Sequence, residues 1–418
     1  MGSVVPTAKL AARFAGPQQG ETTTHRRDSS MNHAIASLSW PEVSARRMER
    51  SSLSAPSPQA GSAEIVSALC GAHAQVLSAA ELAVALRIEG ATRSDVRTDL
   101  WDRRQVVKTY GPRGTVHLLT TADLPMWIGA FSSIPQSPSP FPKDVRMTED
   151  QTEQVVAAIG KSLESAELTI DELTDAVVEA TGPWAGDLVM EAFQGKWPRW
   201  RQAMTLAAHR GVLCFAPNRG RKVTYTNPLR YLSGISPLDG PTAQARLVQK
   251  YLHAYGPATP QNFAQWLNAP RGWAGNLFRS LAGEIQEVDF EGTTAWINAG
   301  DTTAPADTPR GLRLLPYFDA YVVAAQPRSL LYPGRAAERA LTPSGQAGNY
   351  PVLMVDGTVA GVWHQRRSGR RIHVTVEPLK PLSAAQLAEL DEQVERVATV
   401  LEGKPELTIG TVSVGGHA

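Results

Sequence analysis

The stretch SAAELAVALRIEGATRSDVRTDLWDRRQVVKTYGPRGTVHLL, residues 78–119, carries the clearest fold signal in the chain. Ser78, followed three residues later by Glu81, has the pattern of a capping box and opens a helix expected over 79–87. The run Thr92-Arg-Ser-Asp95 starts a further helix, expected over 94–101. Two helices joined by a short connector are typical of a helix-turn-helix.

A hairpin follows these helices. Residues 106–110 and 115–119 have strand character and are joined by a Gly-Pro-Arg-Gly turn at 111–114. One more helix is expected ahead of the quoted stretch, over 63–69. Three helices followed by a hairpin predict a winged helix, a helix-turn-helix with a β-wing, over residues 61–145.

The same order of elements is expected twice more along the chain. In a second unit, residues 146–235, we expect helices at 149–163, 170–181 and 200–210 and hairpin strands at 211–217 and 222–226. In a third unit, residues 236–308, we expect helices at 241–255, 260–266 and 273–281 and strands at 285–290 and 294–298. The repeat concerns the order of elements and not residue identity.

The two ends of the chain differ from this middle part. Residues 1–60 are polar, rich in Ser, Thr, Pro and Gly, and hold no long amphipathic period, so we expect them to be disordered. Residues 309–418 turn to strands, which we expect at 312–315, 352–355, 358–365 and 371–376, before a final amphipathic helix at 383–402. The predicted fold class is α+β.

Composition excludes several classes of protein. The 418 residues hold 41 Lys and Arg against 40 Asp and Glu, a net charge of +1, which excludes a histone-like polycation. Cys70 and Cys214 are the two cysteines, and we expect both to be reduced core residues, with neither a disulfide framework nor a cysteine-based zinc site. With no apolar run of membrane length and no secretory signal, we expect a cytoplasmic protein without a membrane partner.

The connector Gly71-Ala-His-Ala-Gln-Val-Leu77 holds the first candidate for chemistry. If it is extended, His73 and Gln75 point to one side while Ala74 faces the core. A base beside an amide can orient and deprotonate a water molecule. A histidine that caps a neighbouring helix and a surface glutamine are the alternative interpretation.

Basic residues gather on the predicted hairpin tips, which suits contacts to DNA phosphates or entry into a minor groove. The hairpin at 364–373 carries Arg366, Arg367, Arg370 and Arg371; the one at 218–222 carries Arg219, Arg221 and Lys222; and Arg103, Arg104, Lys108 and Arg113 surround the first. A solvated surface is the alternative for any one cluster. Residues 61–418 hold 34 basic and 36 acidic side chains, so their net charge is slightly negative. Any contact with DNA must therefore come from local clusters of basic residues such as these.

The apolar segment 314–323 contains one acid, Asp319, between Phe318 and Tyr321. A buried aspartate there could cap a helix, bind an arginine, or stabilise positive charge developing on a sugar. The histidines do not stand at metal-ligand spacings, and we expect no metal.

Taken together, several blocks resemble the AlkZ/YcaQ-type winged-helix DNA glycosylases. These blocks are GAHAQVLSAAELAVALRIEG at 71–90, RGTVHLL at 113–119, RQAMTLAAHRGVLCFAPNRG at 201–220, LLPYFDAYVV at 314–323 and VDGTVAGVWHQRRSGRRIHVTVEPL at 355–379. The resemblance implies three tandem winged helices packed around a C-terminal β-barrel. It also implies a monomer that acts on double-stranded DNA containing alkylated purines, with the hairpin at 364–373 in the minor groove.

The resemblance further implies cleavage of the N-glycosidic bond of N7-alkylated guanine, without a cofactor, a metal or a lyase step. Bulky adducts formed by genotoxins and interstrand crosslinks are the implied targets, in DNA repair or in self-resistance. The family's Gln-x-Gln motif is His73-Ala74-Gln75 here, so Gln75 inherits a water-positioning role and His73 acts either as a general base or as a second water ligand. Arg113, His117, Asp319 and Tyr321 are expected to support the site. The alternatives are a winged-helix regulator without enzymatic activity and a structural factor that binds DNA ends or crosslinks.

Overall fold

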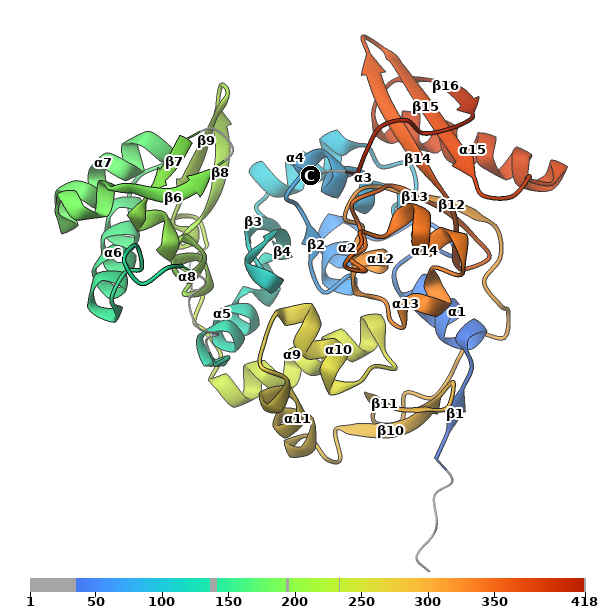
Figure 1. Cartoon of the computed structure of the whole chain (residues 1–418), viewed down its shortest axis with the longest axis horizontal. Coiled ribbons are helices and arrows are strands. Elements are labelled where there is room, and N and C mark those ends of the chain that lie inside the picture. The colour runs from blue at the N-terminus through green and yellow to red at the C-terminus, as the bar shows by residue number, and fades with distance from the viewer. Residues whose placement is uncertain (1–34, 136–140, 193–194, 233, 417–418) are drawn as a thin grey trace, which may run out of the picture. The chain divides into compact units, whose positions relative to one another are not determined.

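The computed structural model describes residues 35–135, 141–192, 195–232 and 234–416. Each helix and strand of these residues belongs to the unit that begins at Ala36 (Figure 1). No helix in the described ranges combines the length and the apolar character needed to cross a membrane.

The three helices and the hairpin expected around the quoted stretch are present (Figure 1). They are α2 (Ser62–Ala68), α3 (Leu77–Ala85), α4 (Arg93–Trp101), β3 (Val106–Tyr110) and β4 (Val116–Thr120), with the short strand β2 (Ala72–His73) between α2 and α3. The strands form a sheet in the order β2-β4-β3. A further helix, α5 (Leu124–Ser133), leads to the second unit.

The two helix starts predicted in this stretch have different outcomes. The helix start at Thr92 is confirmed, and the structure shows a capping box there, since the Thr92 backbone N–H donates to Asp95 at 2.8 Å where α4 begins. The Ser78 box is wrong, because α3 already begins at Leu77 and Glu81 is buried in an ion pair with Arg97. Glu81 therefore links α3 to α4 through Arg97 and does not cap the start of α3.

The second unit has the expected order with two additions. Its elements are α6 (Glu149–Leu163), β5 (Leu168–Thr169), α7 (Ile170–Thr181), β6 (Leu188–Ala192), β7 (Gly195–Pro198), α8 (Met204–His209), β8 (Cys214–Arg219) and β9 (Lys222–Thr226). Neither the short strand β5 nor the ribbon β6–β7 was expected from the sequence. The predicted helix over 200–210 is divided into a 3₁₀ turn, Arg199–Ala203, followed by α8.

The third unit repeats the order once more and gains a strand from the N-terminal part of the chain. Its elements are α9 (Gly240–Tyr255), α10 (Pro260–Leu267), α11 (Arg271–Ser280), β10 (Ile285–Phe290) and β11 (Thr293–Asn298). Strand β1 (Ser37–Leu38) pairs in parallel with β10.

The expectation of disorder up to residue 60 is wrong for the segment that includes helix α1 (Trp40–Arg50). Arg47 of this helix is buried and donates hydrogen bonds to the backbone oxygens of Gly256, Pro257 and Gln326. A short helix in a polar region gives little periodic signal, and here tertiary contacts stabilise it.

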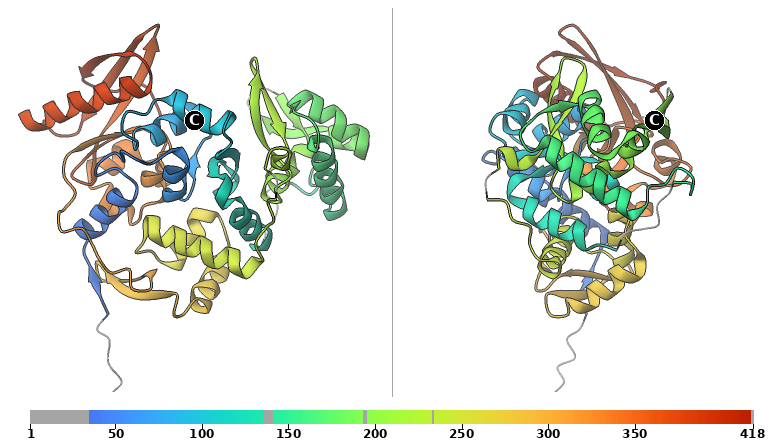
Figure 2. Two further views of the ribbon diagram at one scale, coloured as in Figure 1. Left: turned by 180° about the vertical axis from the view of Figure 1, so that it is seen from behind. Right: turned by 90° about the vertical axis from the view of Figure 1, so that its left-hand side faces the viewer.

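The C-terminal part is a sheet and not the expected barrel. Its elements are β12 (Leu312–Leu315), α12 (Ala320–Ala324), α13 (Arg328–Leu331), α14 (Arg335–Ala340), β13 (Val352–Val355), β14 (Thr358–Ser368), β15 (Arg371–Pro378), α15 (Ala384–Val400) and β16 (Lys404–Ile409). The strand order β12-β13-β14-β15-β16 leaves β12 and β16 as edges that do not pair. Helix α15 packs against both edge strands, where closure would have to occur (Figure 2).

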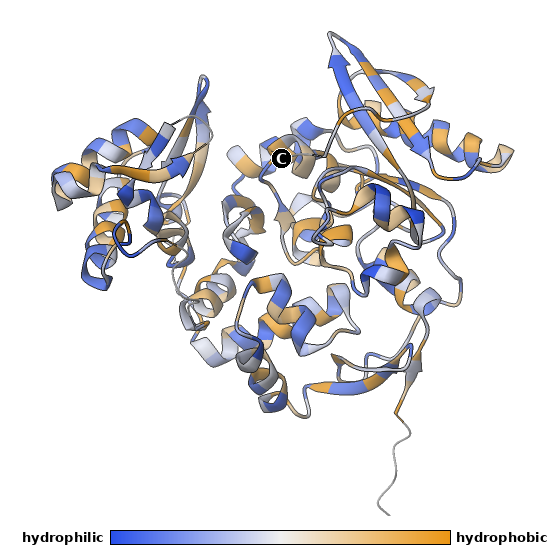
Figure 3. Ribbon diagram, viewed as in Figure 1, coloured by the Kyte–Doolittle hydropathy of each residue, from blue (hydrophilic) through white to orange (hydrophobic). Residues whose placement is uncertain are grey.

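Side chains alternate between buried and exposed along β15, as expected for a sheet with one covered face, and hydropathy alternates along the hairpin in Figure 3. The covered face joins the core of the first unit. Val84 and Leu118 of that unit belong to the same buried cluster as Leu314 and Trp363 of the sheet. This shared core fixes β2 relative to the segment that follows β12.

Candidate active site around His73 and Gln75

The connector that carries His73 is extended, as predicted. Residues 72 and 73 form β2, which pairs antiparallel with β4 so that His73 lies opposite His117. The backbone N–H of Ala74 donates to the Val116 oxygen at 2.7 Å, and the Ala74 side chain is fully buried. The alternation expected for this segment is therefore confirmed, with Ala74 in the core.

Two aromatic contacts hold the His73 ring. It stacks on Phe318 with ring centroids 4.6 Å apart and meets the edge of His117 at 5.0 Å. Its Nδ1 atom is buried and has no hydrogen-bond partner within the described structure. Burial, with a smaller effect from Arg113, lowers the pKa of His73 to about 4, so the imidazole is neutral at neutral pH.

His117 supports this arrangement from β4. Its Nδ1 lies 2.9 Å from the Thr115 backbone oxygen, and since a carbonyl only accepts, Nδ1 carries the proton. Burial holds the pKa of His117 well below its usual value. Gly111 leaves room for the ring, because a Cβ atom there would lie 2.9 Å from His117 Cγ.

Gln75 has an exposed side chain in the same short segment. Its Oε1 accepts a hydrogen bond of 3.3 Å from the backbone N–H of Val116. The carbonyl end of the amide is thus tied to β4, which leaves the NH₂ end to donate to a bound molecule.

His73 and Gln75 line a cavity of about 520 Å³. The other residues that line it come from the first unit, from α10 and its C-terminal turn, and from the C-terminal part: Arg113, Thr115, Asn262, Gln265, Trp266, Asn268, Phe318, Val323, Ala324, Gln326, Arg328, Gln346, Ala347 and Asn349. Its volume lies in the range of small-molecule sites.

Arg113 lies in this wall, as its expected supporting role requires. Its Nη1 donates to the Trp266 backbone oxygen at 2.7 Å, and burial lowers its pKa to about 10. The residue has a φ of +61°, in the left-handed region, within the turn between β3 and β4. The guanidinium therefore joins the first hairpin to α10 and brings positive charge to the cavity.

Asp319 and Tyr321 lie behind the wall and do not line the cavity. The Asp319 carboxylate is 1% exposed, caps α12 by accepting from the Tyr321 N–H at 3.0 Å, and forms an ion pair with Arg87. Both the capping and the arginine interpretation hold, while a direct role at a sugar does not fit this position. The Tyr321 hydroxyl lies 3.3 Å from Ser44 Oγ.

The four arginines of the β14–β15 hairpin have different surroundings. Arg367 donates to the Leu401 backbone oxygen at 2.6 Å, and Arg371 pairs with Glu406 at 3.1 Å. Arg366 and Arg370 are exposed and form no ion pair with any described residue. Among the described residues, these two are the arginines of the hairpin whose guanidinium groups neither pair with a carboxylate nor donate to the backbone.

Neighbouring carboxylates neutralise the basic tip of the β8–β9 hairpin in part. Arg219 pairs with Glu172 and Lys222 pairs with Asp171 at 2.9 Å, both on the first turn of α7. Arg221 is exposed and has no ion-pair partner within the described ranges.

Three basic residues near the first hairpin also interact with neighbouring side chains. Arg103 pairs with Asp99 at 2.9 Å, Arg104 lies 4.3 Å from the Tyr231 ring centroid, and Lys108 lies 4.5 Å from that of Phe215.

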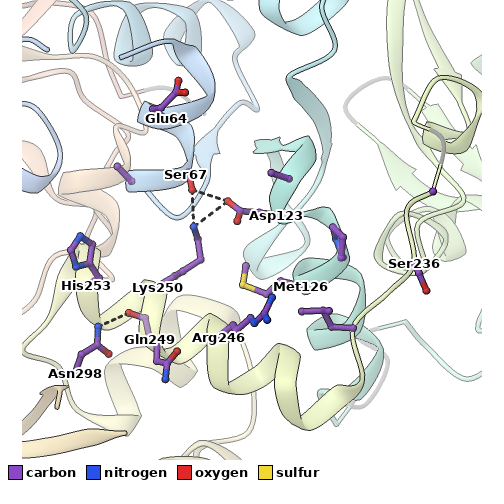
Figure 4. A pocket seen from close by; sticks show the side chains of 15 residues that line it. Glu64, Ser67, Asp123, Met126, Ser236, Arg246, Gln249, Lys250, His253 and Asn298 are labelled. Atoms are coloured by element: carbon purple, nitrogen blue, oxygen red, sulfur yellow. Dashed lines mark hydrogen bonds and ion pairs between the residues drawn. The ribbon is translucent and has the colours of Figure 1, made fainter. Parts of the chain in front are cut away.

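A second, larger cavity of about 840 Å³ lies between α2, the start of α5 and α9 (Figure 4). Lys250 of α9 donates to Ser67 Oγ at 2.7 Å and lies 3.2 Å from Asp123, whose carboxylate accepts from Ser67 at 2.9 Å. Because the lysine and the aspartate neutralise each other, we interpret this triangle as a tether between the first and third units.

Sequence reasoning missed the residues that complete the first cavity. Phe318 was noted only as a neighbour of Asp319, and the amides of α10 and of residues 346–349 were not noted. No local sequence pattern predicts these residues, because they are about 190 or more positions from His73 in the sequence and only tertiary packing brings them to it.

With this geometry established, comparison with known proteins identifies the family. Residues 66–400 match the family described as AlkZ-like DNA glycosylases. The chain belongs to the AlkZ-like DNA glycosylase family. The resemblance found in the sequence is thereby confirmed, and this glycosylase has DNA as its substrate.

One relative and one solved structure illustrate the similarity. The interstrand DNA cross-link repair glycosylase of Streptomyces sahachiroi is 32% identical over 346 residues, which cover 78% of this chain and 87% of the relative. The structure of the DNA glycosylase AlkZ from the same organism superposes with a TM-score of 0.75 at 27% identity and covers 90% of this chain and all of that one. The AlkZ-like fold therefore extends over nearly the whole chain.

Proposed function

We propose that this glycosylase hydrolyses the N-glycosidic bond of guanine alkylated at N7 in double-stranded DNA, with His73 and Gln75 holding the attacking water. The observation that carries the proposal is that the neutral His73 imidazole and the Gln75 amide line the same cavity. An imidazole nitrogen and an amide in one wall are suited to bind one water molecule.

The chemistry needs little more than this. Alkylation at N7 places a positive charge on the base, so the base leaves as a neutral molecule while positive charge passes to the sugar. Water then attacks C1′, its proton is released, and the products are the free alkylated base and an abasic site. With a pKa near 4, His73 is a weak base, which favours orientation of the water as its main contribution.

The proposal includes hydrolysis without a lyase step. Imidazole and amide groups bind and orient water but do not form the Schiff base through which a lyase acts. Because the S. sahachiroi relative is named for interstrand cross-link repair, we extend the proposal to guanines in such crosslinks.

Binding to the duplex is assigned to the repeated units and to the long hairpin. We propose that the three successions of helices and hairpin are winged helices, that the protein acts as a monomer, and that β14–β15 enters the minor groove near the lesion. The exposed Arg366 and Arg370, which form no ion pair among the described residues, support a phosphate contact there.

The test is incubation with a duplex that carries one N7-methylguanine, followed by alkali to cleave abasic sites. We expect excision by the wild type, and a loss of most excision in His73→Ala and Gln75→Ala at unchanged DNA affinity. Tight binding without release of base by the wild type would overturn the proposal and favour a regulator or structural factor. Unchanged rates in both variants would remove the water-binding assignment.

A further inference from the structure

The wall that faces His73 is rich in amides whose polar groups are not used by the protein. Gln265, Asn268, Gln326, Gln346 and Asn349 line the cavity, and no side-chain amide among them hydrogen-bonds to another described residue. Gln326 and Asn349 are half-buried and the other three are exposed. Because these amides are not engaged by the protein, a bound ligand can form hydrogen bonds with them in place of water. The cavity is also far larger than a water molecule and a methyl group require.

The charge of the same cavity is positive and uncompensated. Arg113 and Arg328 both contribute to its lining, and no Asp or Glu side chain is found among the described residues that line it. Arg328 donates to the Ala325 backbone oxygen at 2.8 Å and also to the oxygens of Val322 and Val323, so carbonyls and not carboxylates surround its guanidinium. Hydrogen bonds to carbonyls satisfy the donors but leave the charge in place.

The titration of neighbouring groups agrees with this charge distribution. Burial is the main cause of the low pKa values of His73 and Arg113. Repulsion from Arg113 lowers the pKa of His73 further, and repulsion from Arg328 lowers that of Arg113. A cation entering the cavity would meet the same repulsion.

We propose that this cavity is a subsite for the substituent carried on the alkylated base, and that it accepts neutral or anionic, oxygen-bearing substituents and disfavours cationic ones. The inference rests on the proposed function, because it requires an alkylated base next to His73. Carbonyl and hydroxyl oxygens accept hydrogen bonds from the amide NH₂ groups. An ammonium group finds no carboxylate and lies near two guanidinium groups.

Binding to non-hydrolysable DNA separates recognition from chemistry. The duplexes carry a 2′-fluoro sugar, which resists hydrolysis, and an N7 substituent of one chain length that ends in a carboxamide, a carboxylate or a trimethylammonium group. By fluorescence anisotropy we expect the carboxamide and carboxylate duplexes to bind at least about tenfold more tightly than the ammonium duplex. Equal affinities for the three duplexes would overturn the inference.

Charge-reversing variants test whether this cavity is responsible. Gln265→Glu and Asn349→Asp preserve shape and add a carboxylate, so they should raise affinity for the ammonium duplex and lower it for the carboxylate duplex. Gln154→Glu, at an exposed amide on α6 outside the cavity, is the matched control and should leave the preference unchanged. A preference that shifts equally in all three variants would also overturn the assignment, since it would reflect net charge alone.

Excision of hydrolysable N7-methylguanine distinguishes the two proposals. If the wild type excises the methylated base but binds all substituents equally, the subsite is wrong and the proposed function stands. If it excises no alkylated base at all, both are wrong.

Discussion

Arg87 and Asp319 join the segment that follows helix α3 to the start of α12 through two hydrogen bonds of 2.8 Å, and both side chains are fully shielded from solvent. Arg87 also donates to the backbone oxygens of Ser51 and Ala83. The pair thus fixes the backbone next to Phe318, whose ring stacks on His73. This buried ion pair therefore helps to position Phe318, and through it His73, without lining the cavity itself.

Removal of the Asp319 carboxylate should destabilise the fold. Asp319→Ala leaves the Arg87 charge buried without a partner, which we expect to lower the free energy of unfolding by about 3–5 kcal/mol. Urea unfolding measures this loss. Glu153→Gln, which breaks the exposed pair with Arg210, is the control and should cost about 0–1 kcal/mol. A fully stable Asp319→Ala protein that has lost excision would instead place the carboxylate at the chemistry.

The pH profile of excision should report the low pKa of His73. We propose that the neutral ring binds the attacking water. With its pKa at about 4, the excision rate should then stay level from pH 8 to 5 and fall toward pH 4 as the ring becomes protonated. His73→Gln restores the Gln-x-Gln pattern, and we expect it to retain activity and lose this acid limb. The single-turnover rate on N7-methylguanine DNA, corrected for spontaneous depurination, checks both. An inflection near pH 6.5 in the wild type would contradict a neutral, buried His73.

Stability should also depend on pH through His73. The unfolded ring has its usual pKa near 6.5 and the folded ring about 4, so the unfolded state binds more protons as the pH falls between these values. Stability is therefore highest above pH 6.5 and declines toward pH 4, by about 2 kcal/mol at pH 5 for this one group. Urea unfolding of wild type and His73→Gln at pH 7.5 and 5 isolates the contribution. Equal pH dependence in the two proteins would be inconsistent with it.

The arginines of the β14–β15 hairpin should separate into binding and structural groups. Arg366→Ala and Arg370→Ala each remove an exposed cation with no carboxylate partner in the described structure, so each should weaken DNA binding and reduce the slope of log K against log salt by about 1. Arg371→Ala, whose side chain pairs with Glu406, should change the slope less. Filter-binding titrations from 50 to 200 mM salt, roughly the range in which phosphate contacts are resolved, measure the slopes. Slopes that remain at the wild-type value would argue against DNA contact at this hairpin.

Acidic residues on α7 should limit the contribution of the β8–β9 hairpin to binding. Asp171→Asn releases Lys222 from its exposed ion pair and should increase DNA affinity and the salt slope, if this hairpin contacts DNA as the sequence predicted. Glu179→Gln, further along the same helix, changes the net charge equally and serves as the control. The same increase in both variants would show a general charge effect and no contact at Lys222.

Local patterns were sufficient for much of the fold and for the central motif. The helix start at Thr92, the succession of helices and hairpins, and the extended segment with His73 and Gln75 on one side all follow from interactions within a few residues. The resemblance in motif order led to the correct family, which the match over residues 66–400 confirms.

Contacts between distant segments account for the remaining features. Arg47 anchors helix α1 to backbone oxygens more than 200 residues away. The C-terminal strands form an open sheet, and α15 packs against both of its edge strands. The low pKa of His73, its contact with Phe318 and the amides that face it depend on burial and on which side chains packing brings together. Electrostatic and solvation energies depend on distances in three dimensions, and the order of residues along the chain does not specify those distances.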